Sequence, residues 1–164
     1  MQIGFIGTGH ITKSVIFGIL GSKLKVNKII ISKRNHKISS TLKNKSKKIT
    51  VLNDNQKIID QSDWVFLSVT PEVGHKILPN LKFKKNQTII SFISTIKMKE
   101  LKKYTKLKSK IVRAIPLPPI SIRKGPVPIY PPNKNVKKFF DHLGTTVEIK
   151  NENLSLNFWS TSSM

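Results

Sequence analysis

The clearest chemical signal in the sequence is a glycine-rich segment near the N-terminus, residues 7–12, which reads Gly-Thr-Gly-His-Ile-Thr. It follows a short apolar run and precedes residues with helical spacing, the setting in which Gly-x-Gly loops hold phosphate groups. Gly7 permits the tight turn, and Gly9 lets a diphosphate approach the helix N-terminus, where free N–H groups favour anions. Thr12 replaces the third glycine of the usual fingerprint. We predict dinucleotide binding; the alternative is an ordinary glycine-rich turn.

A second polar cluster follows the next apolar run. Ser32, Lys33 and Arg34 begin 23 residues after Gly9. Enzymes specific for NAD have an acidic residue here, which holds the ribose 2′-hydroxyl, whereas a hydroxyl with two cations suits a 2′-phosphate. Lysine is common throughout the chain, but Arg34 is one of only three arginines. We therefore predict NADP, rather than NAD, as the cofactor.

The segments that must position these clusters alternate between apolar runs and helical spacing. Expected strands cover residues 1–6, 28–32, 49–52, 64–69, 88–93, 110–115 and 145–149, and expected helices cover 10–20, 35–48, 54–60, 97–104 and 135–143. This alternation predicts an α/β fold of the Rossmann type, with a doubly wound, mostly parallel sheet and helices on both faces. Ligands of such sheets bind at the carboxyl ends of the strands.

Two proline-containing segments interrupt this pattern. Thr70 and Pro71 end the strand expected over 64–69, where they either line the nicotinamide side of the cleft or simply terminate the strand. Seven prolines then occur between Pro116 and Pro132. Proline cannot continue a helix or donate to a sheet ladder, so we predict an extended or edge-strand path there and no helix.

Composition limits the classes of function. The chain has no cysteine, which excludes disulfides and thiolate metal sites, and its four histidines are too dispersed for a metal site. The net charge is +22, but 27 of the 30 basic residues are lysine, whereas sequence-reading nucleic-acid proteins depend on arginine. We predict no specific nucleic-acid partner, with a polyanion site as the alternative. Without a long apolar run or signal-like start, we expect a cytoplasmic protein with no membrane partner.

These residues together resemble the pyrroline-5-carboxylate reductase family, in the 6-phosphogluconate-dehydrogenase-like group. Residues 3–11 are similar to that family's phosphate loop, and residues 32–34 to its Ser-x-Arg at the NADP phosphate. Residues 63–71 are similar to its Asp-x-Val-φ-Leu-Ala-Val-Lys-Pro segment, and residues 113–119 to its Arg-x-Met-Pro-Asn-Thr-Pro segment. Leu117 and Pro118 replace the Asn-Thr pair of that last segment.

The resemblance implies an NADP-dependent oxidoreductase of proline biosynthesis, a branch of amino-acid biosynthesis, which transfers a hydride from NADPH to a cyclic imine. The cofactor contacts that it implies, together with the two clusters, are Gly7, Thr8, Gly9, His10, Ile11, Ser32, Lys33, Arg34, Asn55, Val69, Thr70 and Pro71. Because Leu117 and Pro118 remove two polar groups, another imine or carbonyl substrate is an alternative. A stand-alone nucleotide-binding module without turnover is a second one.

The resemblance also implies a division of the chain. Residues 1–150 are expected to form the NADP-binding domain, and residues 151–164 the start of a helical dimerisation domain that is cut short. The family's catalytic hydroxyl residues belong to that helical domain, so we assign no catalytic residue here. We therefore expect the isolated chain to bind the cofactor without turnover, and to form a homo-oligomer only when the second domain is present.

Overall fold

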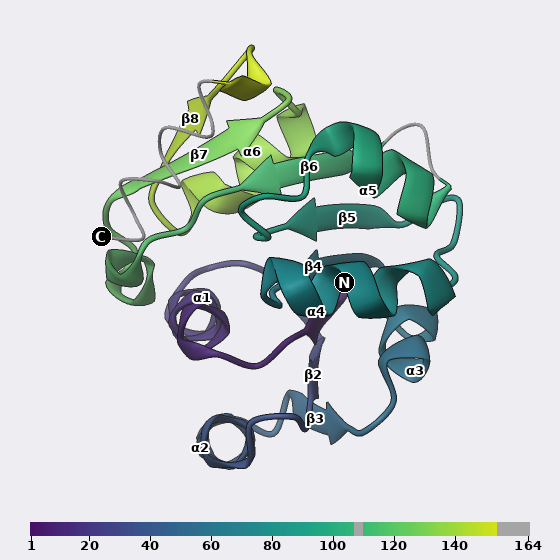
Figure 1. Ribbon diagram of the computed structural model, residues 1–164. Coiled ribbons are helices and arrows are strands. Elements are labelled where there is room, and N and C mark those ends of the chain that lie inside the picture. The colour runs from purple at the N-terminus through teal and green to yellow at the C-terminus, as the bar shows by residue number, and fades with distance from the viewer. Residues whose placement is uncertain (107–109, 154–164) are drawn as a thin grey trace.

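Eight strands form one sheet in the order β3-β2-β1-β4-β5-β6-β7-β8 in the computed structural model, which describes residues 1–106 and 110–153 (Figure 1). The strands are β1 (Gln2–Ile6), β2 (Lys28–Ser32), β3 (Ile49–Leu52), β4 (Trp64–Leu67), β5 (Thr88–Ser91), β6 (Ile111–Ala114), β7 (Pro126–Tyr130) and β8 (Thr145–Glu148). Neighbouring strands are parallel except for β6 and β7. The predicted Rossmann-type, mostly parallel sheet is confirmed.

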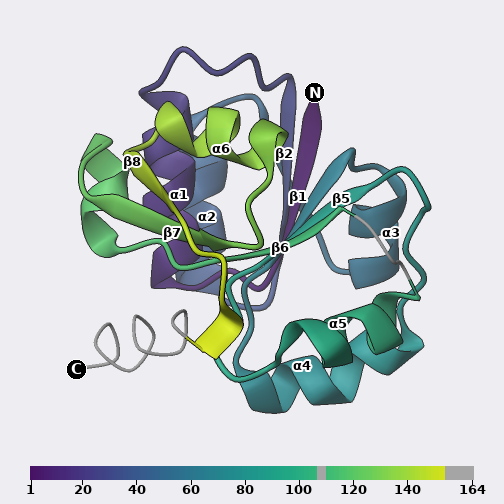
Figure 2. The same cartoon turned by 90° about the horizontal axis from the view of Figure 1, so that it is seen from above.

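Helices cover both faces of this sheet (Figure 2). One face carries α1 (His10–Leu20), α2 (His36–Lys45) and α6 (Lys134–Asp141), and the other carries α3 (Asn55–Asp60), α4 (Pro71–Ile77) and α5 (Met98–Thr105). Two short 3₁₀ helices, η1 (Leu78–Asn80) and η2 (Pro118–Ile122), complete the described elements. No helix among the described residues is long and apolar enough to cross a membrane.

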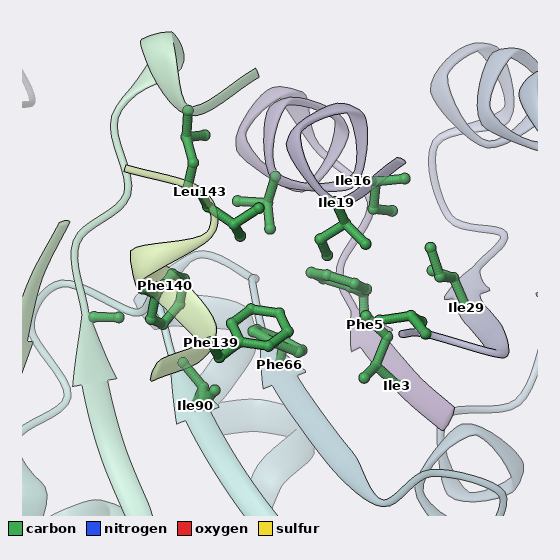
Figure 3. Close-up of a cluster of buried hydrophobic side chains, with 14 of the residues drawn as sticks. Ile3, Phe5, Ile16, Ile19, Ile29, Phe66, Ile90, Phe139, Phe140 and Leu143 are labelled. Carbon is green, nitrogen blue, oxygen red and sulfur yellow. The ribbon is translucent and has the colours of Figure 1, made fainter. Parts of the chain in front are cut away.

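The core lies in two layers, one on each face of the sheet. Under α1 and α6, the rings of Phe5 and Phe66 stack with centroids 4.5 Å apart, and Phe139 lies 5.7 Å from Phe66 (Figure 3). Isoleucines dominate the opposite layer. The run Ile29–Ile31 is fully buried, as expected of a strand covered on both faces. This packing holds the strand ends, where ligands bind, on a rigid base.

The helix α4 was not predicted from the sequence. Its signals are short but specific: the Thr70 side chain accepts a hydrogen bond from the Val73 N–H at 3.4 Å, and Pro71 occupies the first turn. A threonine N-cap followed by proline is a common helix start. The prediction placed Thr70 and Pro71 at the end of a strand, either lining the nicotinamide side of the cleft or simply terminating the strand, and overlooked that the same pair can open a helix.

The extended path predicted for the proline-rich segment is present over Pro126–Tyr130, but the exclusion of a helix was wrong, and so was the edge-strand alternative. Pro118 and Pro119 begin η2, because a proline in the first turn of a helix has no N–H to satisfy. β7 is not an edge strand, since it pairs with β6 on one side and β8 on the other. Pro128 is tolerated because the ladder uses its carbonyl, which accepts from Ile115 N at 2.9 Å. The segment is therefore part of the sheet rather than a border to it.

The sheet ends with β8, and only a few described residues follow it. Glu152 and Asn153 are helical, while the remainder of the helix predicted over residues 151–164, with Phe158 and Trp159, lies outside the described residues. The division near residue 150 therefore stays a prediction, because most of the second unit lies outside the described residues.

Candidate functional site

A pocket of about 710 Å³ opens at the carboxyl ends of β1, β2 and β4, where the fold predicts ligand binding. Its wall is formed by the loop after β1, the start of α2 and the turn between β4 and α4. The residues that line it are Gly7, Thr8, Gly9, Arg34, Asn35, His36, Lys37, Ser68, Val69, Thr70 and Val73. Arg34 of the second predicted cluster thus lines the same cavity as the glycine-rich loop.

The two glycines of the loop have different structural roles. Gly7 has φ = +101°, and a Cβ there would lie 2.2 Å from the backbone oxygen of Ser68, so the fold itself requires glycine. A Cβ on Gly9 would meet nothing within 4 Å. The protein alone therefore gives no reason for glycine at this position. The bare backbone leaves open space in front of α1, whose first turn has no side-chain cap and no acidic residue.

The open space at Gly9 matches what a diphosphate needs. The uncapped N–H groups at the start of an eleven-residue helix attract and hydrogen-bond anions. The absence of a β-carbon lets phosphate oxygens reach those N–H groups. The residues present therefore fit the dinucleotide cofactor that the sequence predicted.

Ser32 is placed differently from its predicted role at a 2′-phosphate. Its side chain is buried, and its Oγ accepts from Gly7 N at 3.1 Å and lies 2.8 Å from Thr8 Oγ1. Thr8 Oγ1 also donates to the Ser32 carbonyl at 2.6 Å. These bonds connect the end of β2 to the phosphate loop. Ser32 thus holds the loop, and it does not line the pocket.

The cationic side chains at the pocket are Arg34 and Lys37. They flank the start of α2, where Asn35 Oδ1 accepts from Ile38 N at 3.1 Å and caps the helix. Lys33 does not line the pocket, although it belongs to the predicted cluster. Lys37 was missed, yet its signal was present: it lies two residues after Asn35, a residue of N-cap type that directly follows Arg34.

Only some of the remaining predicted cofactor contacts line the pocket. Val69 and Thr70 line the pocket, while Pro71 begins α4 and Asn55 begins α3, and neither of these two lines it. His10 and Ile11 line a second, neighbouring hollow. Besides Lys37, the lining residues that sequence reasoning missed are Asn35, His36, Ser68 and Val73.

The second hollow, of about 360 Å³, is separated from the first only by the start of α1. It is lined by His10, Ile11, Ser14, Phe92, Ile115, Pro116, Leu117 and Pro118. Most of these side chains are apolar. Three of the residues belong to α1, and the others follow β5 and β6. Leu117 and Pro118, the departures from the resembled family, form part of this wall.

Beneath the β5–β6 ends lies a buried ion pair. Arg113 Nη1 is 3.0 Å from Glu152 Oε2, and Arg113 Nη2 donates to the carbonyls of Ile93 and Ser94. Glu152 Oε2 also accepts from Met98 N, the first residue of α5, at 2.7 Å. Burial lowers the pKa of Arg113, and the hydrogen bond and charge of Glu152 oppose that shift. Arg113 therefore joins strand ends rather than facing the hollow.

Metal chemistry finds no support in the described part of the chain. There, no group of three or more His, Cys, Asp or Glu side chains is arranged to hold a metal ion. The arrangement instead offers an anion-binding loop, two cations and an adjoining apolar hollow. Such a site can bind a phosphorylated dinucleotide and place its reactive ring beside a small apolar ligand.

Comparisons with known proteins agree with this geometry. Residues 2–95, more than half of the chain, match the family described as NADP oxidoreductase, coenzyme F420-dependent. Pyrroline-5-carboxylate reductase of Arabidopsis thaliana is 25% identical over 123 residues, which are 74% of this chain and 44% of that protein.

Solved structures show the same fold. The 1-pyrroline-5-carboxylate reductase of Streptococcus pyogenes superposes with a TM-score of 0.80 at 24% identity, covering 99% of this chain and 62% of that one. Pyrroline carboxylate reductase of Plasmodium falciparum, solved with NADP bound, gives 0.75 at 19% identity, covering 94% and 59%. The chain spans less than two thirds of each of these relatives. It belongs to the NADP oxidoreductase, coenzyme F420-dependent, family, and its expected resemblance to the N-terminal domain of pyrroline-5-carboxylate reductases is confirmed.

Proposed function

We propose that residues 1–150 form the NADPH-binding domain of a reductase that transfers hydride to a cyclic imine such as pyrroline-5-carboxylate. The observation that carries this proposal is the open backbone at Gly9, in the same pocket as Arg34 and Lys37. Family membership and the names of the relatives support it. The role in proline biosynthesis belongs to the same proposal, as does the cytoplasmic location.

The proposed orientation of the cofactor follows from the wall of the pocket. The diphosphate would lie over residues 7–10, where the N-terminus of α1 is open. The 2′-phosphate would lie between Arg34 and Lys37, because charge-assisted contacts there outweigh any neutral alternative. The nicotinamide half would face Val69, Thr70 and Val73, on the side of the β4–α4 turn.

The chemistry divides between cofactor and protein. NADPH, when bound, supplies the hydride. This chain binds and orients the dinucleotide, and the hollow lined by Phe92, Ile115 and Leu117 excludes water beside it. Accurate positioning of two reactants accounts for about 7–11 kcal/mol of many reaction barriers. We assign no proton donor to this chain.

The apolar hollow also supports a second candidate within the same class. Leu117 and Pro118 present no side-chain hydrogen-bond donor or acceptor to a ligand. A substrate with an apolar ring and no polar group on this side would therefore bind at least as well as pyrroline-5-carboxylate. The second candidate is a reductase of such an imine or carbonyl compound. Comparing turnover of the two substrate types by the complete protein discriminates between them.

The test of the cofactor assignment is the preference for NADPH over NADH. Charge-assisted hydrogen bonds are worth about 1.5–3 kcal/mol, so we expect about a 10-fold or larger preference, most of it lost in Arg34→Ala. Lys99→Ala, which removes an exposed charge on α5, is the matched control and keeps the preference. Calorimetry measures all six affinities, three proteins with two cofactors each. Equal affinities of the wild type for the two cofactors would contradict the assignment.

The same preparation tests the division of labour between the two proposed domains. We expect the 164-residue chain to bind NADPH but to oxidise it with pyrroline-5-carboxylate at far below about 1 s⁻¹, a rate at the low end for enzymes. The reason is that this chain supplies only one described wall of the substrate hollow. Turnover by the chain alone at an ordinary enzymatic rate would place the whole active site within residues 1–164.

A further inference from the structure

Thr12 occupies the third position of the glycine fingerprint, where a glycine serves close packing of helix against strand. The side chain is fully buried in α1 and does not line the pocket. Its Oγ1 donates to the carbonyl of Gly7 at 2.8 Å and lies 2.9 Å from Ser68 Oγ. One hydroxyl therefore connects three parts of the chain: the phosphate loop, the first helix and the end of β4.

This connection is specific to the nicotinamide side of the proposed site. Ser68 is the first residue after β4, and its neighbours Val69 and Thr70 form the wall on that side. The backbone of Gly7 lies directly against the Ser68 carbonyl, since a Cβ on Gly7 would be 2.2 Å from that oxygen. The adenosine side has its own connection, in which Ser32 Oγ accepts from Gly7 N at 3.1 Å.

Gly7 is thus held from two sides by two different hydroxyls. Its N–H is bound by Ser32 from β2, and its carbonyl is bound by Thr12, which also contacts Ser68. A buried hydroxyl has to be hydrogen-bonded, whereas an apolar side chain at position 12 would fill the same space without that requirement. The threonine is explained if the hydrogen bonds themselves set the position of the loop.

We propose that Thr12 is a positioning residue for the cofactor: its hydroxyl fixes the distance between the phosphate loop and the Ser68–Thr70 wall, and so determines how the nicotinamide half is held. This inference rests on the proposed NADP binding. It makes a prediction that packing alone does not, because the effect should fall on one half of the dinucleotide only.

The experiment compares two ligands on wild type, Thr12→Val and Thr12→Ser by calorimetry. NADP⁺ occupies the whole site, while 2′,5′-ADP carries the adenosine, the 2′-phosphate and one phosphate of the diphosphate, without the nicotinamide half. Thr12→Val keeps the shape and removes the hydroxyl, and we expect it to bind NADP⁺ about 5- to 10-fold more weakly and 2′,5′-ADP within about 2-fold of wild type. Thr12→Ser restores the hydroxyl and should recover most of the NADP⁺ affinity.

Two controls separate this effect from general destabilisation. Thr105→Val removes another buried helical hydroxyl, which donates to Leu101 O at 2.8 Å on α5, and should not change either affinity. Ser68→Ala removes the partner instead of Thr12. In the Thr12→Val, Ser68→Ala double variant, the loss of NADP⁺ affinity should be smaller than the sum of the two single losses. If Thr12→Val does not fold, Ser68→Ala alone still tests the contact between the two hydroxyls.

The outcomes distinguish the inference from the function on which it rests. If wild type binds neither ligand, the proposed cofactor site is wrong. If wild type binds both ligands but Thr12→Val weakens them equally, or Thr12→Ser is as poor as Thr12→Val, the positioning role is overturned. Additive losses in the double variant would also overturn it, because they would show that Thr12 and Ser68 act independently.

Discussion

Two groups of buried polar side chains lie at the carboxyl ends of the sheet strands and connect neighbouring segments in different ways. Around the phosphate loop, neutral hydroxyls of Thr8, Thr12 and Ser32 connect β1 to the ends of β2 and β4. At the ends of β5 and β6, a charged pair, Arg113 and Glu152, does the joining. The hydroxyls link segments next to the ligand pocket, whereas the ion pair links the sheet to the segment after β8.

The difference follows from the structural roles of the cofactor pocket and of the β5–β6 ends. A cofactor pocket needs anion-attracting backbone and must not present a competing carboxylate, so neutral donors and acceptors suit its supports. The β5–β6 side has to hold together a strand end, the start of α5 and residue 152, and a guanidinium with several donors reaches more than one of them. A buried charge, however, depends on its partner far more than a buried hydroxyl does.

The largest expected effect is therefore on the charged side. Glu152→Ala leaves the buried Arg113 guanidinium without its carboxylate and removes the acceptor of the Met98 N–H. Breaking a buried pair at one partner costs about 3–5 kcal/mol, and because Glu152 is one-fifth exposed we expect about 3 kcal/mol less free energy of unfolding. Urea unfolding followed by circular dichroism measures this.

Measuring NADP⁺ affinity in the same variant shows whether the ion pair affects binding as well as stability. NADP⁺ affinity of folded Glu152→Ala should stay within about 2-fold of wild type, because the pair lies outside the pocket. Glu152→Gln, which keeps a hydrogen-bond acceptor of the same shape, should lose less stability. A stability change under about 1 kcal/mol in Glu152→Ala would show that the pair does not hold the β5–β6 side.

On the hydroxyl side, the expected effect is smaller and falls on binding instead of stability. Gly9→Ala adds a methyl group that meets no atom within 4 Å in the protein, at φ = −105°. We expect near wild-type unfolding but about a 10-fold or greater loss of NADP⁺ affinity, or about 1.4 kcal/mol, because the methyl fills the space meant for the diphosphate. Calorimetry and urea unfolding on the same variant separate the two quantities.

Gly7→Ala is the matched contrast for Gly9→Ala. Its φ of +101° and the 2.2 Å approach to Ser68 O make the added carbon clash with the backbone, so stability should fall with or without ligand. If Gly9→Ala bound NADP⁺ as tightly as wild type, the diphosphate would not lie over this helix.

The same contrast explains what the sequence could reveal. The pocket was predictable because its parts are local: a strand, a Gly-x-Gly turn and a helix follow one another within residues 2–20, and strand-end positions converge in any parallel sheet. Lys28–Ser32 and His10–Leu20 were predicted with the bounds that the structure has. Periodicity and glycine placement carry this information directly.

Long-range contacts could not be predicted in this way. Nothing in the spacing shows that Arg113 meets Glu152, 39 residues later, or that Ser32 turns inward to Gly7 instead of outward to a phosphate. Strand-end side chains alternate in direction, and a shift of one residue reverses it. The proline-rich segment was misjudged for a related reason: which carbonyls of β7 would be used depends on its neighbours, β6 and β8.

The smallest expected effect comes from an exposed pair, which shows how much burial contributes. On α6, Lys137 Nζ lies 2.8 Å from Asp141 Oδ2, with both side chains nearly half exposed. The hydrogen bond from Lys137 lowers the pKa of Asp141, and the hydrogen bond to Asp141 raises the pKa of Lys137. A lowered acid pKa stabilises the fold above the ordinary value of 3.8, and this contribution is lost as the pH falls through the folded pKa. A raised lysine pKa stabilises below 10.5 and is lost at higher pH.

Asp141→Asn should therefore lower stability slightly at neutral pH, and the difference from wild type should vanish once the pH is well below the ordinary pKa of the carboxyl. Urea unfolding of both proteins, from about pH 6 down to about pH 2, measures the difference. Solvent and salt screen such a pair, so added salt should reduce the difference further, whereas the loss in Glu152→Ala should hardly respond to salt. An equal loss of unfolding free energy in Asp141→Asn and Glu152→Ala would contradict this. It would show that charge pairing, rather than burial, determines how much each ion pair stabilises the protein.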